Sequence, residues 1–342
     1  MINNVFCPDC FTRDKKRILI IAMFSNSSIL VTHVAQVIAG SLLLINFVFF
    51  PGAAFADRAD NLKEKYDEIE GQLLDNIYGI PIYLESNSGS HLMQGEVYGI
   101  LYHPYKKVSR SLSTIENWCE IMPQHFNIKA CTYEYKNNIC RLTFYSGRKY
   151  YKKADDVYHL NYDFNVKMNN DERLYVSLNS EWGPLDTKNY NISVEAIPLT
   201  DQSTFFHLSY EYQFGFVTRI AMSTYLSTIG HKKIGFSITG RDENNKPVYV
   251  GGVRGIIERN AVRYYFAIKS YLNTQGVDIN KRFETRLSDW YELTERYHEQ
   301  LHELDKSDYL KYKKMERKNQ LRLQKEIDAN IKGNQKAIKC LI

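Results

Sequence analysis

The sequence predicts an α+β fold in which an antiparallel sheet is covered by one long helix. Three observations carry this prediction. Residues 251–272 have the apolar spacing of a helix with a wide apolar face, residues 160–214 alternate apolar and polar side chains, and residues 57–79 and 279–342 have charged helical patterns. Strands with one polar and one apolar face indicate an antiparallel sheet that is solvated on one side.

The composition is that of a globular protein. Of the 342 residues, 44% are apolar and 24% are charged, so a substantial core can form. The net charge of +5 is modest, and we expect no nucleic-acid partner. The 26 tyrosines suit sheet faces and amphipathic pockets, because each joins an apolar ring to a hydroxyl.

The first 56 residues predict export. No Asp, Glu, Lys or Arg occurs between Arg17 and Asp57, residues 37–50 form an apolar run, and Ala54-Phe55-Ala56 is a small-residue cleavage pattern. We therefore expect residues 1–56 to be a signal peptide and the mature chain to be periplasmic or secreted. The alternative is an uncleaved segment anchored in the inner membrane, since about 20 apolar residues span a bilayer.

The mature chain begins with a helix expected over residues 57–79, closed by Gly79 and Pro81. A strand pair follows at 82–86 and 92–102, and two short helices are expected at 105–112 and from about 113 to 122. Period-two alternation then predicts strands over 160–168, 174–182 and 206–214. A helix over 217–229 and a turn at 242–245 lead to the long helix.

Residues 279–342 form a charged helical extension. Between Lys306 and Lys336, ten Lys or Arg residues face four acidic residues, and apolar positions are sparse. We expect this segment to be solvated, and its basic helix suits contact with a membrane surface.

Four cysteines lie in the mature part: Cys119, Cys131, Cys140 and Cys340. They allow three pairings, and in an oxidising compartment Cys119–Cys131 is the disulfide we expect. The alternative is that Cys119 is a nucleophile beside His125. The earlier Cys-Pro-Asp-Cys at residues 7–10 resembles half a zinc site or a redox pair, but no second Cys or His pair completes a metal site, so we expect none.

The order of elements over residues 80–273 resembles the helix-grip arrangement of START-like (SRPBCC-type) proteins, which include polyketide cyclases and lipid-transfer domains. That resemblance implies a curved sheet gripping the long helix, with a cavity between them, in a domain over residues 80–278. A narrower resemblance is to a family of exported bacterial proteins that brings no established activity. The residues that carry it are Trp118-Cys119, His125-Phe126-Asn127, Cys131, Gly252-Val253-Arg254-Gly255 and Glu258-Arg259-Asn260.

A cavity-lining set can be predicted from the polar residues of the long helix. Asn260 and Tyr264 lie four residues apart on its apolar arc, and a buried amide or hydroxyl needs a partner. The candidate ligand-binding residues are Arg254, Glu258, Asn260, Tyr264, Tyr210 and Tyr212. Arg254 and Glu258, spaced i to i+4, can equally be an ordinary helix ion pair.

Two functions of different class follow. The first is a binding or transfer protein that holds a lipid or another hydrophobic small molecule in the cavity. The second is a START-like enzyme, of cyclase or hydrolase type, with an acid or base among His125, Glu258 and the tyrosines. The absence of nucleotide, metal and nucleophile motifs favours binding without a cofactor. A third hypothesis is an envelope interaction module that uses the charged C-terminal helix.

Overall fold

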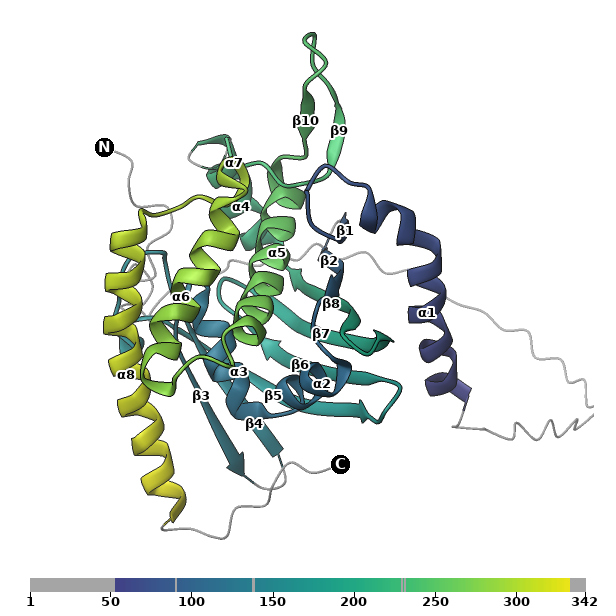
Figure 1. The fold of residues 1–342 in the computed structure, drawn as a ribbon. Coiled ribbons are helices and arrows are strands. Elements are labelled where there is room, and N and C mark those ends of the chain that lie inside the picture. Colours follow the sequence, from purple (N-terminus) through teal and green to yellow (C-terminus); the bar gives the residue numbers. More distant parts are fainter. Residues whose placement is uncertain (1–52, 90, 137–138, 229, 231, 333–342) are drawn as a thin grey trace, which may run out of the picture. The chain divides into compact units, whose positions relative to one another are not determined.

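The computed structural model describes residues 53–89, 91–136, 139–228, 230 and 232–332 (Figure 1). Within this part of the chain, eight strands form one antiparallel sheet in the order β1-β2-β8-β7-β6-β5-β4-β3. The strands are β1 (Ile82–Ser88), β2 (Leu92–Leu101), β3 (Ile128–Lys136), β4 (Ile139–Ser146), β5 (Tyr158–Asn169), β6 (Leu174–Trp182), β7 (Thr187–Thr200) and β8 (Ser203–Phe214), and β9 (Ile238–Arg241) and β10 (Pro247–Tyr249) form a separate hairpin.

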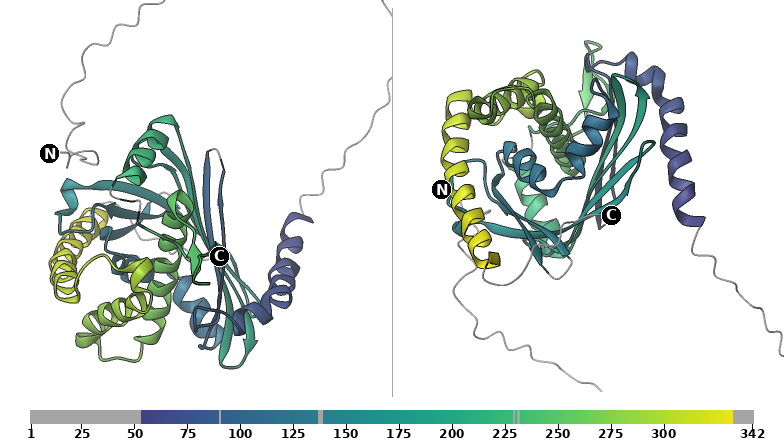
Figure 2. Two further views of the ribbon diagram at one scale, coloured as in Figure 1. Left: turned by 90° about the horizontal axis from the view of Figure 1, so that it is seen from above. Right: turned by 60° about the horizontal axis from the view of Figure 1, so that its bottom comes forward.

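The helices lie on both faces of the sheet (Figure 2). They are α1 (Ala53–Leu74), α2 (Tyr105–Leu112), α3 (Ile115–Ile121), α4 (Phe216–Ser227), α5 (Gly252–Asn273), α6 (Ile279–Glu295), α7 (His298–Leu301) and α8 (Lys306–Lys332). The predicted fold class is confirmed: the antiparallel sheet packs against the long helix α5 in a helix-grip arrangement.

The predicted signal peptide or anchor falls on residues 1–56, of which 1–52 lie outside the described residues. In the part of the chain that the structure describes, no helix has both the length and the apolar character needed to cross a membrane.

Two glycines of β2 allow α5 to approach the sheet closely. A Cβ atom added at Gly95 would lie 3.1 Å from Cγ1 of Ile257, and one added at Gly99 would lie 2.7 Å from the hydroxyl of Tyr265. Gly95 and Gly99 are four residues apart, so both face the same side of the strand. Their missing side chains therefore set the distance between the helix and the sheet.

Helix α1 covers part of the opposite face, which the sequence predicted to be solvated. Its residues Leu62, Ile69 and Leu73 are buried against Tyr98 and Phe205 of the sheet. The helix ends at Leu74 and not at Gly79 as expected. The side chain of Asn76 explains the earlier end, because its amide donates to the carbonyl of Leu73 at 2.8 Å and its oxygen accepts from the backbone of Tyr78.

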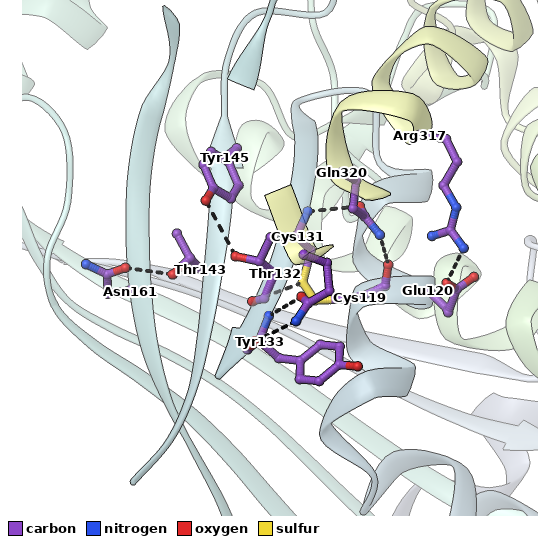
Figure 3. Close-up of a disulfide and its surroundings, with 11 residues drawn as sticks. Cys119, Glu120, Cys131, Thr132, Tyr133, Thr143, Tyr145, Asn161, Arg317 and Gln320 are labelled. Carbon is purple, nitrogen blue, oxygen red and sulfur yellow. Dashed lines mark hydrogen bonds and ion pairs between the residues drawn. A yellow bond between two sulfur atoms is a disulfide. The ribbon is translucent and has the colours of Figure 1, made fainter. Parts of the chain in front are cut away.

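Helix α8 corrects the prediction of a solvated extension, because one polar stripe of this helix covers the edge strand β3. Gln320 accepts a hydrogen bond from the backbone N–H of Cys131 and donates one to the carbonyl of Cys119 (Figure 3). One turn later, Gln324 accepts from the N–H of Tyr133 and donates to its carbonyl. The two amides thus make the hydrogen bonds that a further strand would make.

Charged residues of the same stripe are also buried. The ammonium group of Lys313 donates to the carbonyls of His125 and Ile128 at 2.9 Å each, and it pairs with Glu316 at 2.7 Å. Glu316 also lies 3.0 Å from Lys129 of β3. Burial, together with the charge of Lys313, lowers the pKa of Lys129 to about 8. The sequence does not reveal this interface, because its contacts are polar and a polar stripe on a helix is also typical of a solvated face.

We expect Gln320→Ala to lower the free energy of unfolding by about 2 kcal/mol, because it leaves the amide of Cys131 and the carbonyl of Cys119 without partners in a buried place. Urea denaturation measures this change. Lys325→Ala, at an exposed position of the same helix, is the control and should change stability by less than about 0.5 kcal/mol. Equal stability of both variants would show that α8 does not hold the edge of the sheet.

Candidate ligand-binding site

A pocket of about 420 Å³ lies where β8 leads into α4. The turn between β1 and β2, the helix α4 and the first turn of α5 surround it. Most of its surface is apolar, with Arg219 as the charged residue in its lining. The lining residues are Ser88, Gly89, Phe214, Arg219, Met222, Ser223, Leu226 and Val253.

Five tyrosines form a cluster between the sheet and α5, which we call the tyrosine cluster. They are Tyr162 of β5, Tyr190 of β7, Tyr210 and Tyr212 of β8, and Tyr264 of α5. Tyr264 meets Tyr210 edge to face with 5.3 Å between ring centroids, and Tyr190 stacks on Tyr212 at 4.9 Å. Each tyrosine is at most 9% exposed.

The hydroxyl groups of this cluster are mostly without partners. Tyr190 donates to the hydroxyl of Thr187 at 2.9 Å. The other four hydroxyls make no hydrogen bond to any described residue, yet none of them is among the fully enclosed polar atoms that lack a partner. Each therefore keeps some accessible surface although its ring is buried. Burial raises the pKa of all four, so they are neutral hydrogen-bond donors.

The pocket and the cluster are neighbours along β8. Phe214 lines the pocket, and Tyr212 and Tyr210 follow it on the same face of the strand, because alternate residues share a face. On α5, Val253 lines the pocket, and Asn260 and Tyr264 lie two and three turns further along the helix. The polar groups thus follow the apolar pocket along both β8 and α5.

Asn260 is the accessible residue in an otherwise buried stretch of α5. Every other residue from Ile257 to Ile268 is buried. Its side chain faces His125, which is 1% exposed and lies 5.1 Å from the ring of Tyr264. Burial and the nearby Arg263 hold the pKa of His125 well below its usual value, so the imidazole is neutral. Its Nδ1 accepts from the backbone of Asn127, which leaves the proton on Nε2.

Arg254 and Glu258 belong to a different contact, so this part of the predicted set is corrected. The carboxylate of Glu258 accepts four hydrogen bonds: from the backbone N–H groups of Phe236 and Ser237, and from the hydroxyls of Ser86 and Ser237. Arg254 lies 3.7 Å from Glu258 and donates to Ser86 at 3.1 Å. The two residues fasten the segment before β9 to α5, and the ion-pair alternative holds.

A second network fixes α5 to the chain after α7. Glu303 pairs with Arg259 at 2.5 Å and with Lys149 at 3.2 Å, and it also binds Lys233. Burial alone would raise the pKa of Glu303, but Arg263 and Lys233 outweigh burial and hold it at about 2. Lys233 is thus part of the network that holds α5.

The expected disulfide is present between Cys119 of α3 and Cys131 of β3, with 4.9 Å between the Cα atoms (Figure 3). A disulfide sulfur is not a nucleophile, so Cys119 cannot act as a nucleophile while it is bonded to Cys131.

The structure brings together Asn260, Tyr264, Tyr210 and Tyr212 from the predicted set. It adds Tyr162 and Tyr190, which the sequence did not select. The alternating pattern places Tyr162 on the inner face, but only the strand order shows that β5 and β7 bring these rings to the cluster.

We expect Tyr210→Phe to leave the free energy of unfolding unchanged or to raise it by up to about 1 kcal/mol, because it removes a buried hydroxyl that has no partner. Tyr190→Phe is the matched comparison, and it should lose about 1 kcal/mol because its hydroxyl is bonded to Thr187. Urea denaturation of the two variants checks the difference. A Tyr210 variant as unstable as the Tyr190 variant would mean that the Tyr210 hydroxyl has a structural partner.

The lowered pKa of Glu303 predicts that the free energy of unfolding depends on pH. Its pKa in the folded protein, about 2, lies below its usual value of 4.5, so the unfolded chain binds the proton first as the pH falls. The stabilisation, on the order of 3 kcal/mol, is complete above about pH 4.5 and is lost as the pH falls towards 2. Glu303→Gln should lack this dependence in urea denaturation at pH 3 to 7. Glu299→Gln, an exposed control, should keep it.

No protein-family model and no curated protein matches this sequence. Among solved structures, the chain is similar to the Zhui aromatase/cyclase from Streptomyces sp. R1128 (10% identity, TM-score 0.28, 36% of this chain and 70% of that chain). It is also similar to truncated norcoclaurine synthase from Thalictrum flavum (12%, 0.28, 42% and 96%) and to human StAR-related lipid transfer protein 5 (14%, 0.27, 51% and 91%). The narrower resemblance to exported bacterial proteins stays a prediction. What the strand order and the packing of α5 establish is the fold, an antiparallel sheet that grips a long helix.

Proposed function

We propose that this protein binds a lipid or another small molecule with an apolar body and a polar end, and holds it between the sheet and α5. One observation carries the proposal: four buried tyrosine hydroxyls have no partner among the described residues and keep accessible surface behind an apolar pocket. A closed core would pair or omit such groups, because an unpaired buried hydroxyl costs about 1–3 kcal/mol.

The chemistry of the pocket and of the tyrosine cluster suggests how the ligand is oriented. Phe214, Met222 and Val253 offer apolar contacts at the entrance. Deeper in, the tyrosine hydroxyls and the Nε2–H of His125 are neutral donors, and Asn260 supplies an amide. The polar end is therefore a hydrogen-bond acceptor, such as a carbonyl, ester or carboxyl oxygen.

Binding is favoured over acid–base catalysis. Glu258, one of the candidate acids or bases, already accepts four hydrogen bonds from protein groups and is fully buried. Membrane contact through α8 is not part of the proposal, because that helix uses one face to cover β3.

The proposal includes export to an oxidising compartment. The uncharged stretch before Asp57 supports it, and so does the disulfide between Cys119 and Cys131, because structural disulfides persist mainly in extracytoplasmic proteins. N-terminal sequencing of the mature chain tests this part separately.

We expect Val253→Trp to fill the entrance and to lower the amount of retained ligand at least tenfold. Native mass spectrometry of protein purified from its own host measures the ligand directly as added mass. Val248→Trp is the control, because Val248 is 43% exposed on the β9–β10 hairpin and lines no part of the pocket.

A second variant, Asn260→Leu, tests the polar end. It should weaken retention and leave the protein folded, at a cost of about 1–3 kcal/mol in the free energy of unfolding, because the buried Nε2–H of His125 faces the Asn260 amide and would lose that neighbour. Wild-type protein that never carries added mass, and that binds no fluorescent fatty acid in vitro, would contradict the proposal.

A further inference from the structure

Three side chains with metal-binding atoms meet where α6 ends and α7 begins. Nδ1 of His298 lies 2.9 Å from a carboxylate oxygen of Glu295, and Nδ1 of His302 lies 3.0 Å from the same carboxylate. The two imidazole rings stack with 4.2 Å between their centroids. One ligand atom from each residue can be chosen so that all three lie within 4.8 Å of one another. This group is separate from the pocket and the tyrosine cluster.

We propose that Glu295, His298 and His302 form a binding site for a late first-row divalent metal ion such as Zn²⁺. Imidazole nitrogen and carboxylate oxygen are ligands that Zn²⁺ prefers. In a tetrahedral shell with bonds of about 2.0 Å, neighbouring ligand atoms lie about 3.3 Å apart, so the observed nitrogen–oxygen separations need only small side-chain shifts. Mg²⁺ and Ca²⁺ fit poorly, because they require more oxygen ligands than this group supplies.

Exposure and charge favour entry of a metal ion from solvent. The side chain of His298 is 67% exposed, while those of His302 and Glu295 are 33% and 23% exposed. The carboxylate supplies a negative charge. Three protein ligands leave a fourth position for water or for a ligand from another molecule.

The proposed metal site adjoins the network around Glu303. His302 directly precedes Glu303, the residue that binds Arg259 and Lys233. A bound metal ion would tie the end of α6 to α7 and thereby restrict the backbone that presents Glu303. The sequence contains the spacing Glu295-x2-His298-x3-His302. The turn between α6 and α7 interrupts it, so helical periodicity alone does not place the three residues together.

Isothermal titration of the full chain with Zn²⁺ tests the proposal. The wild type should bind one Zn²⁺ more than His298→Ala/His302→Ala does, and the single variant His298→Ala should bind at this site at least tenfold more weakly. His91→Ala, which removes another exposed histidine, is the matched control and should bind like the wild type. Titration with Mg²⁺ should give no binding at this site.

Three further measurements keep the test independent of folding and of cysteine. Because His298 is mostly exposed, its alanine variant should keep the wild-type circular dichroism spectrum. The Co²⁺ complex of the wild type should show ligand-field bands of nitrogen and oxygen ligands, without the thiolate charge-transfer band of a cysteine site. Zn²⁺ should raise the melting temperature of the wild type and not that of the double variant. Equal Zn²⁺ binding by the wild type and the double variant, or a site that shows only thiolate bands, would overturn the proposal.

Discussion

The structure depends on one requirement, which is that α5 buries polar side chains along with apolar ones and each needs a partner. Glu258 is bonded to the segment before β9, Arg259 to Glu303, Arg263 to the carbonyl of Leu301, and Ser270 to the carbonyl of Arg286. These partners come from three different parts of the chain. Meeting the hydrogen-bonding needs of one helix therefore places the loop before β9, the helix α6 and the chain after α7.

The candidate site is the place where this requirement is left unmet. Asn260 and Tyr264 lie on the same helix as the four residues above, but the Tyr264 hydroxyl has no hydrogen-bond partner among the described residues, and the Asn260 amide faces the imidazole of His125. Paired and unpaired polar groups thus occur within a single helix. A protein that pairs a buried glutamate with four donors has the means to pair a tyrosine hydroxyl as well.

The sequence predicted those parts of the fold that depend on the period of apolar residues. Alternation along 160–168 and 206–214 located β5 and β8, and the wide apolar face of 251–272 located α5. The same periodicity selected the candidate residues Tyr210, Tyr212, Asn260 and Tyr264. It did not separate Arg254 and Glu258 from Asn260, because helical spacing gives the face of a residue but not which loop will meet it. Strand order and the polar docking of α8 are long-range properties that local periodicity does not contain.

The glutamine contacts of α8 also govern the order in which the chain can complete its sheet. The strand β3 is made early, but the residues that cover its open edge, Gln320 and Gln324, lie almost 200 positions later. Until that late segment arrives, the nascent chain carries an unpaired strand that can add to a strand of another molecule. A premature stop codon before α8 would thus turn a folded domain into a template for aggregation, even with every residue of the candidate site intact.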